Sequence, residues 1–103
     1  MPMFFVQFEA TPQLDNPDSR NSAGAFVNCW IARDTIEEAI RVGREWIAGE
    51  GWIVNEPDEA YVVDESWYRP GAKGREYFEQ ALIDREVFVF YCFPDQEEAD
   101  DED

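Results

Sequence analysis

Residues 25–49 read AFVNCWIARDTIEEAIRVGREWIAG and contain the two periodicities that decide the fold. In the first eight of them, AFVNCWIA, both alternating sets of positions are apolar apart from Asn28, which is typical of a central strand covered on both faces. From 36 to 47 the apolar residues recur at helical intervals and form one stripe. Gly49 supplies a stop. This stretch therefore predicts a buried strand followed directly by an amphipathic helix.

The same criteria extend in both directions from this stretch. Apolar and polar residues alternate over 4–9, as in a strand with one buried face. The other expected elements are a turn-rich loop at 11–24, a strand at 52–55 continued or repeated at 60–63, a loop at 66–74, a helix at about 74–85 and a strand at 87–93. This order predicts an α+β two-layer sandwich, with a mostly antiparallel sheet of four to five strands and two helices on one face. A ferredoxin-like relative is the expected arrangement.

Length and charge divide the chain into two parts. The 103 residues fit one domain. The whole chain carries 24 acidic and 8 basic residues, a formal charge of −16, and seven of the nine residues at 95–103 are acidic. The 17 acids and 8 bases that remain leave −9 for 1–94. We expect a single α+β domain at 1–94, followed by a disordered, solubilising acidic tail, with attraction of a basic partner as the tail's alternative role.

The charge excludes several classes of partner. A strongly negative surface repels phosphate backbones and anionic membranes, so we expect neither nucleic-acid nor membrane binding. No apolar run approaches the roughly 18 residues of a membrane-spanning helix. The opening MPMFFVQFEA lacks a basic leader before an apolar stretch, so a signal peptide is not expected and a cytoplasmic location is the prediction.

The residue inventory also limits the chemistry. The chain has no histidine, which removes the usual activation of serine and cysteine nucleophiles and every zinc site with imidazole ligands. Cys29 and Cys92 lie in apolar runs and are expected to be reduced, buried thiols; a disulfide between them would need neighbouring strands. We expect no metal, no cofactor and no enzymatic activity.

Two strands carry more apolar side chains than a two-layer sandwich can cover. The runs at 25–32 and 87–93 are apolar at both alternating sets of positions, so one set is expected to be exposed, and exposed apolar bands mark interfaces. A second identical chain is the expected cover, and folding of the loops at 11–24 and 64–73 over this face is the alternative. The candidate interface residues are Phe26, Trp30, Phe88 and Phe90 in the strands and Trp67, Tyr68 and Arg69 in the loop.

Other candidate sites receive weaker support from the sequence. The turn at 15–22 collects oxygen ligands but fails the EF-hand pattern. Asn28 needs a hydrogen-bond partner if it is buried, and a loop backbone group is the expected one. A carboxylate enzyme would draw on Glu9, Glu56, Asp64, Glu65 or Tyr91.

The pattern as a whole favours a small acidic, non-enzymatic protein-binding module that forms a homodimer. One alternative is an immunity or inhibitor protein that neutralises a basic partner such as a nuclease. Another is a small-ligand-binding accessory domain with a pocket lined by Trp30, Trp46 and Trp52.

Overall fold

The computed structural model of the chain describes residues 1–13 and 22–94. The expected oxygen-rich turn and acidic tail thus fall wholly or largely outside the described residues. The elements, in chain order, are β1 (Met3–Pro12), β2 (Ser22–Ala32), α1 (Ile36–Gly49), β3 (Trp52–Val63), the short 3₁₀ turn η2 (Glu65–Trp67), α2 (Lys73–Asp84) and β4 (Glu86–Pro94).

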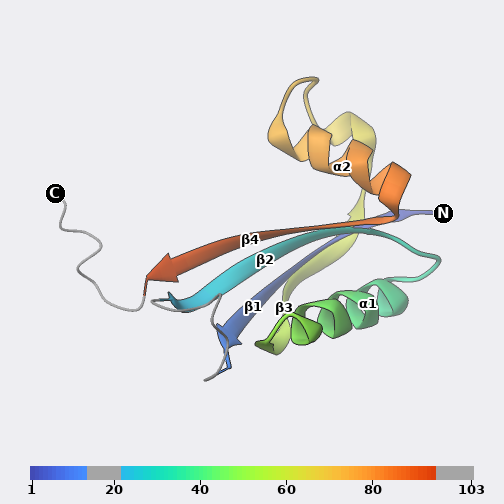
Figure 1. Cartoon of the computed structure of the whole chain (residues 1–103). Coiled ribbons are helices and arrows are strands. Elements are labelled where there is room, and N and C mark those ends of the chain that lie inside the picture. The colour runs from blue at the N-terminus through green and yellow to red at the C-terminus, as the bar shows by residue number, and fades with distance from the viewer. Residues whose placement is uncertain (14–21, 95–103) are drawn as a thin grey trace, which may run out of the picture.

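The four strands form one antiparallel sheet in the order β3-β1-β2-β4 (Figure 1). The expected α+β class and antiparallel sheet are confirmed. The connectivity β-β-α-β-α-β differs from the ferredoxin-like β-α-β-β-α-β order, so the expected ferredoxin-like arrangement is not found. The hairpin of β1 and β2 occupies the centre because the chain crosses to β3 on one side of it and to β4 on the other.

One face of the sheet packs on α1. The side chains of Phe8, Val27 and Ile31 point to this face and are fully buried in one cluster with Ile47 of the helix. The helix comes close because Gly43 faces Phe8: a Cβ built on Gly43 would lie 2.8 Å from Cε2 of the Phe8 ring. We call this side of the sheet the α1 face.

The opposite face packs on α2, where Met3, Phe5 and Trp30 form a second cluster with Phe78 and Ala81 of the helix. The two helices therefore lie on opposite sides of the sheet (Figure 1), and the expectation that they share one face is wrong. The physical reason is that successive side chains of a strand point to opposite faces. Apolar residues at both alternating sets of β2 positions need a cover on both sides.

The ends of the helices follow from local hydrogen bonds. Thr35 is the N-cap of α1, and its Oγ1 accepts a bond of 3.2 Å from the backbone N–H of Glu38. At the end of α2 the backbone N–H of Arg85 donates a hydrogen bond to the carbonyl oxygen of Ala81, with 2.7 Å between nitrogen and oxygen. Arg85 has a φ of 74°, in the left-handed region, and this single residue turns the chain from α2 into β4.

β3 is one strand of 12 residues, so the segment expected at 60–63 continues the strand at 52–55 and is not a separate strand. Its pairing with β1 shifts register between Gln7 and Phe8 and again between Phe8 and Ala10. Pro57 lies at this irregular part of an edge strand, where a missing N–H is tolerated.

The two cysteines differ in environment. Cys29 is fully buried in the α1-face cluster and Cys92 is exposed near the end of β4; both are free thiols. The expectation of two buried thiols is therefore wrong for Cys92. β2 and β4 are neighbours, but Cys92 pairs with Ala25 in register. Four residues at about 3.3 Å each separate that position from Cys29, which is too far for a disulfide.

Among residues 1–13 and 22–94, no helix is both long enough and apolar enough to cross a membrane.

Replacing Gly43 with alanine should destabilise the fold. The added methyl group meets the fully buried Phe8 ring at 2.8 Å, and overpacking of this kind costs about 1–3 kcal/mol, which exceeds the roughly 1 kcal/mol that alanine gains over glycine within a helix. Urea denaturation should show a lower midpoint. Gly49→Ala is the matched control, because nothing lies within 4 Å of its added Cβ; equal effects of the two substitutions would contradict this packing.

The two thiols should react at very different rates in the folded chain. Burial raises the pKa of the Cys29 thiol, so little reactive thiolate forms there. Iodoacetamide should therefore modify Cys92 first and Cys29 only after denaturation, as mass spectrometry of the digested chain can show. Modification of Cys29 at the rate of Cys92 without denaturant would contradict the burial.

Candidate functional site

The four candidate interface residues from the strands do not share one face. Phe26 and Trp30 point to the α2 side. Phe88 pairs with Cys29, and Phe90 pairs with Val27, so these two phenylalanines point to the α1 face. Trp30 is buried and Phe26 is 38% exposed, whereas Phe88 and Phe90 are half-buried. The side chains that were expected to form one exposed band are thus divided between the two layers of the core.

Only one end of the α2 side is covered by the helix. Beyond it lie Phe26 and its register partner Tyr91, which is 49% exposed. Next to them, Nε2 of Gln7 donates a hydrogen bond to Oδ1 of Asn28 at a distance of 2.8 Å. The partner of Asn28 is therefore a neighbouring side chain, not the expected loop backbone group. Tyr61 and Ile53 of the edge strand β3, whose register partners on β1 are Phe5 and Thr11, are also exposed on this side.

The three loop candidates have different environments. The Tyr68 hydroxyl accepts a hydrogen bond from Nε1 of Trp30 at 3.1 Å, and its ring packs against Phe78, so Tyr68 forms part of the cover of the sheet. Trp67 is 61% exposed and lies 6.2 Å, centroid to centroid, from the ring of Tyr61. Arg69 is exposed. We call Tyr61 and Trp67 the aromatic pair.

Three exposed carboxylates lie on the edge strand β3, in the residues that precede Tyr61 of the aromatic pair. Glu56, Asp58 and Glu59 are all exposed on β3. Glu59 accepts a hydrogen bond of 3.4 Å from the Tyr61 hydroxyl. Partial burial and the neighbouring Glu59 carboxylate raise the pKa of Tyr61, so its ring stays neutral at physiological pH. This edge therefore presents negative charge beside exposed aromatic surface.

A capped turn positions Trp67. Asp64 is the N-cap of η2, and its carboxylate accepts hydrogen bonds from the hydroxyl and the backbone N–H of Ser66. Glu65 in the same turn pairs with Arg75 of α2 at 3.2 Å. The hydroxyl and then the backbone bond from Ser66 lower the pKa of Asp64. The Asp64–Ser66 bonds hold the turn itself, and the Glu65–Arg75 ion pair ties it to α2.

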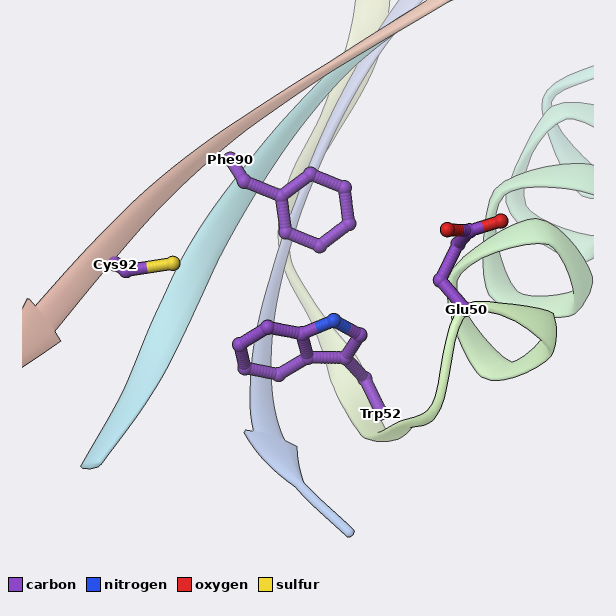
Figure 2. A pocket seen from close by; sticks show the side chains of 4 residues that line it. All are labelled: Glu50, Trp52, Phe90 and Cys92. Carbon is purple, nitrogen blue, oxygen red and sulfur yellow. The ribbon is translucent and has the colours of Figure 1, made fainter. Parts of the chain in front are cut away.

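A second feature lies at the other end of β3. Glu50, Trp52, Phe90 and Cys92 line an open hollow of about 220 Å³ (Figure 2). Figure 2 shows Trp52 and Phe90 on one side and the carboxylate of Glu50 across the opening from them. We call this hollow the Trp52 pocket. It is formed because the indole of Trp52, on one edge strand, reaches Phe90 on the opposite edge strand, with 5.6 Å between ring centroids.

Small side chains and a nearby aromatic stack frame the Trp52 pocket. Ala10 and Ala25 pair on the α1 face at this end of the sheet, and both are fully buried. Their size leaves room for the indole above the two central strands. Trp46 of α1 stacks on Phe88 at 4.1 Å. Of the three tryptophans expected around a pocket, Trp52 lines it and Trp46 lies 6.1 Å from Phe90, whereas Trp30 is on the other face.

The residues named for catalysis do not form one cluster: Asp64 and Glu65 are adjacent at the start of η2 but bind different partners, Ser66 and Arg75. Glu56 pairs with Arg44 at 3.3 Å and Glu65 with Arg75, whereas Glu9 lies on β1. The side chain of Tyr91, on β4, forms a hydrogen bond with the side chain of Tyr77 on α2. Among residues 1–13 and 22–94, no three histidine, cysteine, aspartate or glutamate side chains are grouped so that they could hold a metal ion.

No protein-family model, curated protein or solved structure matched the chain. Sequence reasoning identified Trp67 but not Tyr61, which stands in an ordinary strand pattern. It also missed Glu50 and Cys92 as pocket residues. In the sequence, the only indication for Glu50 and Cys92 is that each lies near the end of a helix or strand, and many exposed residues do so.

The lowered pKa of Asp64 gives a direct test of the turn that holds Trp67. Its ionised form stabilises the folded chain above the ordinary carboxyl pKa of 3.8, and this contribution is lost as the pH falls through the lower, folded value. An NMR titration should give a pKa below 3.8 for the Asp64 carboxyl, and the substitution Ser66→Ala should raise that pKa. An unchanged value in Ser66→Ala would mean that the hydroxyl bond does not hold the turn.

Proposed function

We propose that this chain is a non-enzymatic protein-binding module that binds a basic protein through the aromatic pair and the carboxylates of β3. The observation that carries the proposal is that Tyr61 of β3 and Trp67 of the capped turn η2 are exposed side by side. Tryptophan and tyrosine are enriched among the residues that dominate binding energy at interfaces.

The charge distribution supports a basic partner. Most described basic side chains already pair within the chain: Arg33 with Glu86, Arg41 with Glu45, Arg44 with Glu56, Lys73 with Glu76, and Arg75 with Glu65 and Glu79. The formal charge of the whole chain is −16. A field of this sign raises the rate of encounter with positively charged surfaces. This is the charge pattern expected of an inhibitor or immunity protein.

The homodimer stays a prediction, with less surface available than the sequence suggests. Because α2 covers the Trp30 end of its face, the side chains left exposed on that face are Phe26, Tyr91 and, on β3, Ile53 and Tyr61, beside a hydrogen-bonded pair of amides. Repulsion between two chains of charge −16 opposes association. Light scattering at low and high salt measures the mass directly. A cytoplasmic location and the lack of nucleic-acid binding also stay predictions.

Binding to a set of synthetic peptides of graded charge tests the proposal. The wild-type chain should bind arginine- and lysine-rich peptides and not acidic ones. Affinity should fall as salt rises, since the screening length drops from about 10 Å at 0.1 M to 3 Å at 1 M. Trp67→Ala should weaken binding about thirtyfold, the equivalent of about 2 kcal/mol for a central tryptophan.

Ile83→Ala is the matched control, because Ile83 is 75% exposed on α2 and lies outside the aromatic pair. This substitution should leave peptide affinity unchanged. Equal losses for Trp67→Ala and Ile83→Ala, or binding that does not respond to salt, would contradict the proposed surface.

A further inference from the structure

The Trp52 pocket is separate from the aromatic pair. Trp52 begins β3 and Tyr61 lies near its end, nine residues away, or roughly 30 Å along an extended strand. We infer that this pocket binds an organic cation, an ammonium or guanidinium group carried on a short alkyl chain. The inference does not depend on the proposed protein-binding surface, because none of the residues that line the pocket belongs to that surface.

Aromatic faces provide the first part of the argument. The rings of Trp52 and Phe90 are inclined at 41° with centroids 5.6 Å apart, and Trp46 lies 6.1 Å from Phe90 at 46°. Ring faces carry negative potential and attract cations that lie within about 6 Å of the centroid. Trp52 and Phe90, the two rings that line the hollow, would contact a rounded cationic headgroup from two directions.

Negative charge at the opening provides the second part. The carboxylate of Glu50 faces the aromatic walls across the hollow (Figure 2). Glu50 is also the C-cap of α1, which places the negative end of the helix dipole beside the pocket. The last turn of α1 contains no basic residue. An anionic ligand is disfavoured by the same groups.

The size of the hollow limits the ligand. At about 220 Å³ it lies below the 300–1,000 Å³ that is usual for drug-sized ligands. Val54, Ala10, Ala25 and Cys92 occupy successive register positions across the sheet, so the alanines bring the sheet backbone close beneath this end. A trimethylammonium group or the end of a lysine or arginine side chain matches a site of these dimensions.

A ligand comparison on the full chain tests the inference. The probes are choline, its neutral carbon analogue 3,3-dimethylbutan-1-ol, Nα-acetyl-lysine amide and Nα-acetyl-arginine amide. Choline should shift the indole N–H resonance of Trp52, which Trp52→Phe assigns, and should slow the alkylation of Cys92 at the pocket wall. The neutral analogue has nearly the same shape and should do neither at the same concentration.

Two substitutions and one control distinguish the contribution of the Glu50 charge to choline binding from that of ring contact. Glu50→Gln removes the carboxylate and Phe90→Leu removes a ring while keeping an apolar side chain. Each should weaken the binding of choline about threefold to tenfold. Glu37→Gln, at the other end of α1, makes the same change in net charge and should have no effect. Unchanged amide spectra away from the pocket verify that each variant is folded.

The outcomes are distinct from those of the peptide experiment. Tighter binding of acetyl-lysine or acetyl-arginine amide identifies the cation as a basic protein side chain, and tighter binding of choline identifies a small quaternary ammonium compound; both support the inference. Equal shifts with choline and its neutral analogue, or no shift at about 50 mM of any probe, overturn it. Trp67→Ala should leave choline binding unchanged, so failure of the protein-binding proposal can be recognised separately.

Discussion

The burial of the central β1–β2 pair on both faces is the constraint on which the rest of this fold depends. Each of the two strands directs apolar side chains to both sides, and the fully buried Phe8, Val6 and Ile31 on one side are matched by Phe5 and Trp30 on the other. Two separate helices are therefore needed as covers. The chain meets this need by crossing one face with α1 and the other with α2, which leaves β3 and β4 at the edges of the sheet.

Three layers are a large demand on a chain of 103 residues. Two helices of 14 and 12 residues cannot cover both faces of strands that are 9 to 12 residues long. The features that we associate with binding lie where the cover stops. The Trp52 pocket lies past the end of α1, the exposed Phe26 and Tyr91 lie past α2, and Trp67 belongs to the segment that leads into α2.

The periodicity of side chains in the sequence located α1 and the cores of the strands, because it is a local property, but it did not show that β3 is one continuous strand. The placement of the helices is not local. A run such as AFVNCWIA at 25–32 shows that both faces are apolar but does not show what covers them. The prediction of a two-layer fold left one apolar face of the sheet without a cover, and a second chain was therefore expected there. In the structure α2 covers that face as a third layer. For the same reason Trp30 was assigned to an interface although Tyr68 and Tyr77 cover it. The Trp52 pocket joins residues from opposite sheet edges, and no spacing along the chain reveals such a pair.

The two edges of the sheet differ in what they offer to another polypeptide. On β3, Pro57 has no N–H to donate, two register shifts bend the strand, and charged side chains line it. Natural proteins protect exposed sheet edges with these same devices. β4 has a single charged residue, Glu86, at its first position, and its proline stands at the last. The features that hinder addition of an extended segment are therefore concentrated on the β3 edge, and β4 carries fewer of them.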